Sequence, residues 1–210
     1  MTLRPSLSLL VIGFTVCACN RAPKQPEEPA KQPARAAEAE HDYGAPKVEG
    51  ASASADETKP NALIAVGAPI PKLSAVAQNG ERVDLESFKG KPLVVYFYPK
   101  DDTPGCTIEA QEIRDLWSDI QGTGAAVIGV SVDDDASHKA FAEKYALPFL
   151  LLPDTDRRIT QAFGVGLKSG RARRVTFVFD REGRVAKVFP EVTPKGHGRE
   201  VVDAIKSLGG

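Results

Sequence analysis

Cysteine, net charge and long apolar runs are all scarce in this chain of 210 residues. It has only three cysteines, two of them within the first twenty positions, which excludes a disulfide-framework protein and a cysteine-rich zinc fold. Its net charge of −1 provides no general attraction to nucleic-acid phosphates, so we expect no nucleic-acid partner. The three histidines, His41, His138 and His197, lack metal-ligand spacing. We expect them to be solvated, and we expect neither a metal site nor a cofactor.

A mostly apolar run of ten residues lies at the N-terminus, where residues 7–16 follow Arg4. This is about half of the roughly 20 residues that a membrane-spanning helix needs, so it resembles the hydrophobic region of a secretory signal peptide. The next residues, V-C-A-C ending at Cys19, resemble the lipidation site of bacterial lipoproteins. We therefore expect residues 1–19 to be a signal peptide with a lipobox-like end. The exported protein would be anchored to a membrane, on the periplasmic or cell-envelope side, by lipid on Cys19. Simple secretion without lipid is the alternative.

Residues 20–61 differ sharply from the rest of the chain in composition. They are rich in proline, alanine and charges of both signs, and Val48 is the only aliphatic residue of substantial size between positions 21 and 60. Such a segment buries too little apolar surface to offset the entropy of ordering. We expect it to be a disordered tether with an r.m.s. reach of roughly 35 Å.

Residues 62–210 have the pattern of a folded domain in which strands and helices alternate. An Asn79-Gly80 turn between two short segments predicts an N-terminal β-hairpin, and the apolar run over residues 92–98 predicts a strand covered on both faces. An apolar stripe after Pro104 predicts one helix ending near Gly122. The remaining predicted elements are strands over residues 125–132, 175–179 and 184–189, and helices over residues 136–145, 156–163 and around 201–208.

The predicted order is a β-hairpin, then β-α-β-α, then β-β-α. This order is typical of an α/β thioredoxin-like fold, a central mixed sheet flanked by helices, here with an N-terminal β-hairpin extension. Right-handed β-α-β crossovers place helix N-termini at the carboxyl ends of parallel strands, where open α/β sheets usually bind ligands. Residues 99–106 lie at such an end, so we expect the functional site there.

Residues 99–106 read P-K-D-D-T-P-G-C. This segment closely resembles the peroxiredoxin active-site signature P-x-x-x-T-x-x-C, in the form found in the bacterioferritin-comigratory-protein, or PrxQ, branch. The resemblance covers about residues 62–210 and includes the R-V-T-F sequence that begins at Arg174. It implies a peroxidase that reduces hydrogen peroxide and organic hydroperoxides with electrons from a thiol.

Cys106 is the expected nucleophile of this reaction. At a helix start, unpaired N–H groups and the positive end of the helix dipole favour a thiolate over a thiol. A thiolate attacks the O–O bond of a peroxide, becomes a sulfenic acid and releases water or an alcohol. A lone cysteine within a strand would instead indicate a small buried hydrophobe.

The resemblance implies roles for four further residues. Thr103 would hydrogen-bond a peroxide oxygen, although the same side chain suits a helix N-cap. Pro99 would restrict the loop and shield the thiolate. Arg174 would stabilise the thiolate and the negative charge that develops during O–O cleavage, and Glu109 would orient this arginine. Arg173 is adjacent, but because a strand alternates its faces, only one of the two arginines can readily point inward.

The sequence departs from the family pattern at one position. Many members of this branch carry a second cysteine, five residues after the first, that forms a disulfide with it, and this chain has Gln111 there. With Cys17 removed and Cys19 acylated, the domain keeps no second thiol. The sulfenic acid would therefore be reduced by an external thiol, either a thioredoxin-like protein or a small molecule.

Two other functions are compatible with the same fold. A thioredoxin-like disulfide oxidoreductase normally uses C-x-x-C, and position 103 is threonine, which argues against it. A non-catalytic holdase or interaction module would show only sluggish oxidation of Cys106. The expected partners are thus a hydroperoxide substrate, an external thiol reductant and a membrane, and we expect the protein to be a monomer or weak homodimer.

Overall fold

The computed structural model describes residues 62–209 of the chain. The predictions for the signal peptide, for Cys19 and for the tether lie outside these residues. Within them, no helix is long and apolar enough to cross a membrane.

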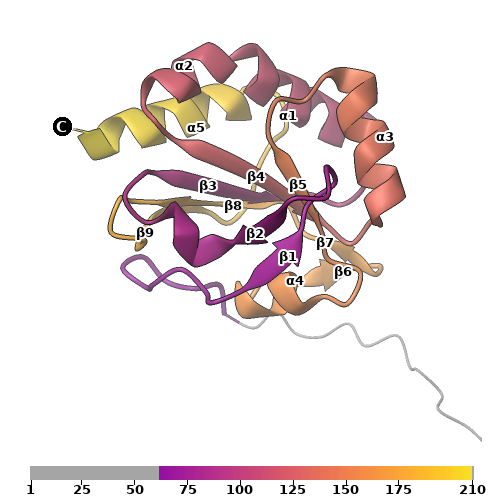
Figure 1. The fold of residues 1–210 in the computed structure, drawn as a ribbon, viewed down its shortest axis with the longest axis horizontal. Helices are drawn as coiled ribbons and strands as arrows, with labels where there is room; N and C mark the ends of the chain where they lie inside the picture. The colour runs from indigo at the N-terminus through magenta and orange to yellow at the C-terminus, as the bar shows by residue number, and fades with distance from the viewer. Residues whose placement is uncertain (1–61, 210) are drawn as a thin grey trace, which may run out of the picture. The chain divides into compact units, whose positions relative to one another are not determined.

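A five-stranded mixed sheet forms the centre of the domain (Figure 1). Its strands are β3 (Leu93–Phe97), β4 (Ala126–Ser131), β5 (Leu150–Pro153), β8 (Val175–Phe179) and β9 (Val185–Phe189). They lie in the order β5-β4-β3-β8-β9. The first three are parallel to one another, whereas β8 is antiparallel to both β3 and β9. This arrangement confirms the predicted mixed sheet.

The central strand β3 is buried along its whole length because both faces of the sheet are covered. Its alternate residues Leu93, Val95 and Phe97 belong to one hydrophobic cluster, and Val94 and Tyr96 belong to another on the opposite face. The strand therefore has no solvent-facing side, which explains why its sequence is continuously apolar rather than alternating.

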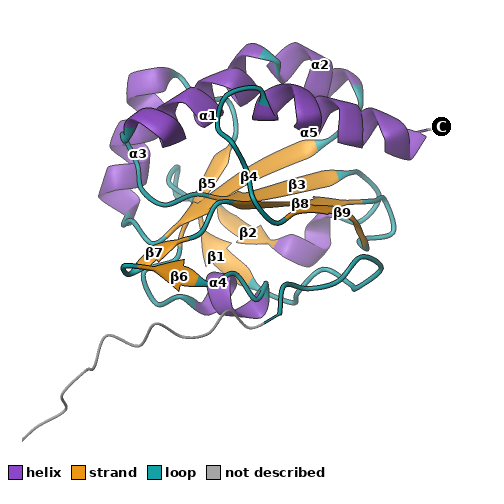
Figure 2. Cartoon of the chain, turned by 180° about the vertical axis from the view of Figure 1, so that it is seen from behind, coloured by secondary structure: helices purple, strands orange, loops and turns teal. Residues whose placement is uncertain are grey.

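Helices cover one face of the sheet, as Figure 2 shows for α1, α2, α3 and α5. These are α1 (Pro104–Asp115), α2 (Trp117–Gly122), α3 (Asp135–Tyr145) and α5 (His197–Lys206), which continues into the 3-10 turn η2 (Ser207–Gly209). The other face carries the hairpin of β1 (Ser74–Val76) and β2 (Arg82–Asp84), the 3-10 turn η1 (Leu85–Phe88) and the short helix α4 (Arg158–Ala162). Gly80 turns the predicted hairpin with a φ of +84°, a backbone angle that favours glycine.

The prediction of a single helix after Pro104 is wrong, because the helical segment divides at Leu116 into α1 and α2. Leu116 leaves helical geometry with φ −96° and ψ 11°, so Trp117 and Ile120 approach the sheet from a second helix axis. Ile108, an apolar residue of the same stretch, is 43% exposed. The apolar residues look like one continuous helical stripe in the sequence, although they belong to two helices with different axes.

Three short strands were not predicted. β5 is an apolar run of four residues with Pro148 just before it and Pro153 at its end, a pattern that is tolerated because it lies at the sheet edge and pairs only with β4. β6 (Leu167–Lys168) and β7 (Arg171–Ala172) form a small separate hairpin, too brief to show alternation in the sequence.

Candidate active site

Cys106 lies in the first turn of α1, which follows the carboxyl end of β3 after the loop of residues 98–103. Pro104 occupies the first helical position, where its missing N–H group costs nothing and its fixed φ favours the helix. The thiol is free and only 2% exposed. The structure thus places the predicted nucleophile where free backbone N–H groups and the helix dipole favour an anion.

Thr103 stands at the N-cap position of α1, but its side chain does not cap the helix. Its hydroxyl instead donates to the Lys100 carbonyl, with 2.9 Å between the two oxygens. The N-capping alternative for this side chain is therefore wrong. Because its proton is engaged, the Thr103 oxygen keeps lone pairs that can accept a hydrogen bond from a peroxide O–H. Pro99, half-buried, begins the same loop after β3.

Arg174 reaches the sulfur from another part of the chain. It directly precedes β8, and the pairing of Phe97 with Val175 places it beside the end of β3. Its Nη2 group donates to Cys106 Sγ over 3.4 Å, and its Nη1 group donates to Glu109. A Cβ atom at Gly105 would lie 3.3 Å from Nη2, so glycine leaves room for the guanidinium.

Glu109 is fully buried beneath this arginine. Burial raises the pKa of Glu109 to about 7, and the positive charge of Arg174 opposes that rise. For Arg174, burial lowers the pKa, but the neighbouring carboxylate and Cys106 outweigh it and the net direction is upward. The arginine therefore stays charged beside the sulfur. From sequence alone Glu109 resembles an exposed acid of the first helical turn, and only the packing against Arg174 reveals its burial.

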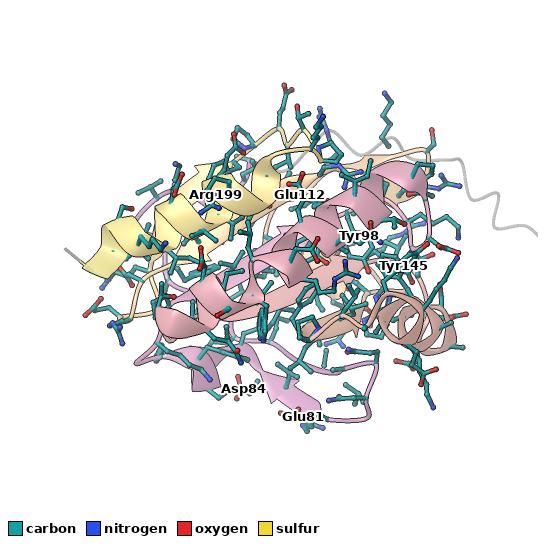
Figure 3. The ribbon with its side chains drawn as sticks, turned by 90° about the horizontal axis from the view of Figure 1, so that it is seen from above. Glu81, Asp84, Tyr98, Glu112, Tyr145 and Arg199 are labelled. Carbon is teal, nitrogen blue, oxygen red and sulfur yellow. The ribbon has the colours of Figure 1, made fainter. Side chains whose placement is uncertain are left out.

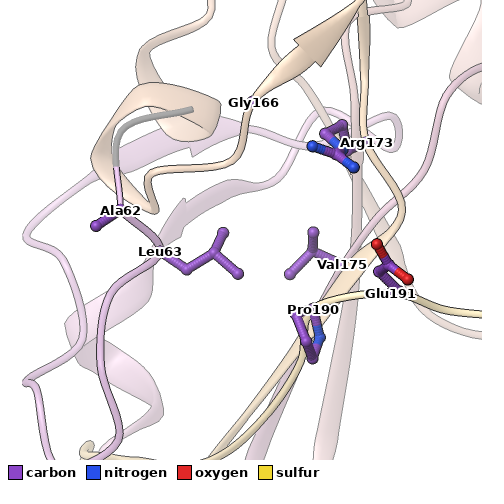
Figure 4. A pocket seen from close by; sticks show the side chains of 7 residues that line it. All are labelled: Ala62, Leu63, Gly166, Arg173, Val175, Pro190 and Glu191. Atoms are coloured by element: carbon purple, nitrogen blue, oxygen red, sulfur yellow. The ribbon is translucent and has the colours of Figure 1, made fainter. Parts of the chain in front are cut away.

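Arg173 points away from the sulfur, as strand alternation predicts for one of the two arginines. It lines a cavity of about 420 Å³ together with Leu63, Val175 and Glu191 (Figure 4). The cavity contains neither Cys106 nor Arg174 among its lining residues. This placement supports the choice of Arg174 rather than Arg173 as the partner of the thiol.

The prediction that His138 and His197 are solvated is wrong, because both are fully buried. His138 Nδ1 lies 2.7 Å from an Asp101 carboxylate oxygen, whereas His197 contacts Thr176 and Glu200 at 2.9 Å each. Burial lowers the pKa of His197 despite the nearby Glu200 carboxylate. One signal was available for His138: it precedes the buried Phe141 by three residues, which places both on one helix face. His41 lies outside the described residues.

Of the three aspartates at 133–135, Asp134 caps α3 by accepting a hydrogen bond from the Ser137 N–H. Among residues 62–209, no three His, Cys, Asp or Glu side chains are grouped so that they could hold a metal ion. Gln111, where a second cysteine would stand, is half-buried on α1.

Comparison with known proteins decides the family. The sequence model described as "AhpC/TSA family" matches residues 66–188. The chain belongs to the AhpC/TSA family. Peroxiredoxin Bcp of Bacillus subtilis is 40% identical over 152 residues, which cover 69% of this chain and 97% of the relative. Chloroplastic peroxiredoxin Q of Suaeda salsa is 42% identical over 150 residues, which cover 70% of each protein.

Solved structures agree with this membership of the AhpC/TSA family. The bacterioferritin comigratory protein of Xanthomonas campestris, described for its alkyl peroxide reduction activity, is 32% identical, with a TM-score of 0.64 over 68% of this chain and 98% of that one. PrxQ of Xylella fastidiosa is 28% identical, with a TM-score of 0.66 over 70% of this chain and 98% of the other. The thioredoxin-like fold is therefore confirmed, and the chain is a thiol-dependent peroxidase of the AhpC/TSA family.

Proposed function

We propose that Cys106 is the peroxide-reactive sulfur of this enzyme and that the chain works with one cysteine. The observation that carries this is the 3.4 Å contact between Arg174 Nη2 and Cys106 Sγ at the start of α1. The thiolate attacks one oxygen of ROOH, the O–O bond breaks, and the other oxygen leaves as RO⁻. A proton then converts RO⁻ to ROH, so the products are Cys106 sulfenic acid and an alcohol, or water when R is hydrogen.

The neighbouring groups divide the remaining work. The Thr103 oxygen accepts the hydrogen bond of the peroxide O–H and aligns the O–O bond with the sulfur. Arg174 stabilises negative charge on the sulfur before the reaction and on the oxygens as the bond breaks. Glu109 holds the guanidinium in place from the buried side, and Pro99 limits the loop's movement.

Reduction of the sulfenic acid then needs two external thiols, because Gln111 supplies no sulfur. A first thiol condenses with the sulfenic acid, which forms a mixed disulfide and releases water. A second thiol attacks that disulfide, which frees Cys106 and leaves the two external sulfurs joined. The reductant is a thioredoxin-like protein or a small-molecule thiol.

Stopped-flow oxidation of the reduced protein tests this assignment. Cys106→Ser should abolish both peroxide consumption and sulfenic-acid trapping, whereas Ile108→Ala, an exposed neighbour on the same helix, should retain them. Undiminished peroxide consumption by Cys106→Ser would refute the proposal. Turnover with a protein dithiol and with monothiols, compared at equal thiol concentration, then identifies the class of reductant.

We also propose that the exported protein is held at a membrane by lipid on Cys19. The support is the V-C-A-C sequence after a short apolar run, together with the composition of residues 20–61. A multiply acylated cysteine adds about 0.8 kcal/mol of membrane affinity per buried CH₂ group, which is enough for stable anchoring. Cys19→Ser should move the protein from the membrane fraction to the soluble fraction, while Cys17→Ser should leave it in the membrane fraction. A soluble wild-type protein would contradict the proposal.

A further inference from the structure

The loop that carries Thr103 is tied to α3 through a buried carboxylate. We call residues 99–103 the active-site loop. Asp101, 5% exposed, accepts hydrogen bonds from Tyr98 Oη, Ser137 Oγ and His138 Nδ1, each over 2.7 Å. A carboxylate offers only acceptors, so His138 Nδ1 carries the proton of that contact. Three donors, two of them from α3, thus converge on one side chain of the loop.

The next residue of the loop is tied to the far end of the same helix. Asp102 accepts from Lys144 Nζ over 2.6 and 2.8 Å and from Tyr145 Oη over 2.5 Å. These hydrogen bonds lower the pKa of Asp102. Its φ of +55° lies in the left-handed region, which a non-glycine residue keeps only where the surroundings hold it. Figure 3 shows Tyr145 and Tyr98 in the region between α1 and α3.

A third tie comes from the segment that joins β4 to α3. Asp133 accepts from the Asp101 N–H over 2.9 Å, from Ser131 Oγ over 2.7 Å and from Lys100 Nζ over 3.1 Å. Burial raises the pKa of Asp133, but these hydrogen bonds outweigh it and the net direction is downward. Residues 100, 101 and 102 are therefore each fixed to the unit formed by β4 and α3.

We propose that Asp101 and His138 are positioning residues for the peroxide reaction. The inference rests on the proposed function of Cys106 and Thr103. We call the hydrogen bonds that hold residues 100–102 to β4 and α3 the clamp. The Thr103 hydroxyl donates to the Lys100 carbonyl, which is next to Asp101, so the clamp sets where the Thr103 oxygen presents its lone pairs. The sulfur has its own support, because Arg174 donates to it and it lies at the start of α1.

Two reactions of Cys106 separate positioning from general stability. Oxidation by peroxide needs both the thiolate and a correctly placed Thr103, whereas alkylation by iodoacetamide needs only an accessible thiolate. The measured quantity is the ratio of the two second-order rate constants, taken for reduced full-length protein well below its melting temperature. His138→Leu, which removes the donor to Asp101, should lower this ratio by about tenfold or more.

Matched variants complete the test. His138→Asn retains an amide donor near the position of Nδ1 and should restore most of the ratio. Phe141→Leu trims a buried ring on the same helix without removing any bond to the loop, so it should lower the melting temperature and leave the ratio unchanged. An unchanged ratio in folded His138→Leu overturns the proposal.

If His138→Leu does not fold, the double variant Lys144→Gln and Tyr145→Phe decides by the same ratio, because both side chains act at the exposed Asp102. A lowered ratio in this variant supports the clamp, and an unchanged ratio overturns it. The wild-type protein serves as the check on the proposed function: a Cys106 that alkylates but does not react with peroxide would refute that function itself rather than the role of the clamp.

Discussion

The two faces of the central sheet are built from different kinds of buried group. The face under β1, β2 and α4 packs four aromatic rings, with Phe163 at 5.1 to 6.1 Å from Phe97, Phe177 and Phe179. Asp154, a buried carboxylate on the same face, accepts hydrogen bonds from the N–H groups of Ile159 and Thr160 at the start of α4. This face is a closed apolar core with its polar groups paired.

The face under α1, α3 and α5 buries charged and polar groups instead, including Asp101, Glu109 and His138. Within residues 62–209, the buried side-chain atoms without a hydrogen-bond partner are Tyr96 Oη, Glu109 Oε1 and His138 Nε2, and all three belong to this face. Buried unpaired polar atoms cost stability and are rare, so their concentration here is typical of a functional site. One face of the sheet is therefore a paired apolar core, and the other holds Cys106 among buried polar groups.

The largest expected effect comes from a substitution in the apolar face. Phe177→Ala removes a fully buried ring and should destabilise the fold by about 3 to 5 kcal/mol. The rate at which folded molecules react with peroxide should stay the same, because the ring lies across the sheet from the site. Urea unfolding and stopped-flow oxidation of one sample measure both quantities, and a matching fall in the rate would contradict this separation of the faces.

A substitution in the polar face should instead act mainly on the rate of reaction with peroxide. Arg174→Gln removes the charged donor to the sulfur and should slow peroxide reduction by about 10² to 10³-fold. Arg173→Gln is the matched control, because its side chain lines the separate cavity, and it should react at the wild-type rate. Equal losses from both substitutions would indicate a general charge effect rather than a contact at the sulfur.

Gly129 tests how tightly the polar face is packed. A Cβ atom there would lie 2.7 Å from a Leu151 methyl group and 2.8 Å from the Tyr96 ring. Gly129→Ala should therefore cost about 1 to 3 kcal/mol in the free energy of unfolding, as overpacking does elsewhere. Gly122→Ala, whose Cβ would meet nothing within 4 Å, is the control. A neutral Gly129→Ala would show that this face yields more easily than its contacts indicate.

The smallest expected effect is a pH dependence that comes from Glu109. Its pKa rises from 4.5 to about 7 on folding, so the folded state binds more protons between those values and stability falls as pH rises through that range. Between about pH 6 and pH 8 the free energy of unfolding falls by about 1 kcal/mol from this cause, with no further loss at higher pH. Glu109→Gln should flatten that slope, while Glu143→Gln, on the exposed side of α3, should keep it. Identical slopes in all three proteins would remove Glu109 as the cause.

Local sequence patterns predicted the parts of the fold that depend on local chemistry. The apolar run at β3, the Asn79-Gly80 turn and the helix start at Pro104 each follow from neighbouring residues. The position of Cys106 at that helix start follows in the same way. What local patterns missed depends on distant partners: the burial of Glu109 requires Arg174, which is 65 positions away, and the burial of His138 requires Asp101. β5 was missed because an edge strand of four residues between prolines has almost no pattern of its own.

The start of α5 is hydrogen-bonded to the last turn of α1, at Glu112. The Glu112 carboxylate accepts from the N–H groups of Gly196 and Gly198, at 2.8 Å and 3.2 Å, and a Cβ at Gly198 would press on the Glu112 backbone at 3.0 Å. Glu112 directly follows Gln111, so these hydrogen bonds hold the helical turn that contains position 111. We expect α1 to stay wound throughout turnover, with unchanged amide exchange on oxidation. The sulfenic acid then has no thiol of its own chain to react with. Whether it is reduced or oxidised irreversibly to the sulfinic acid depends on how fast an external thiol reacts with it.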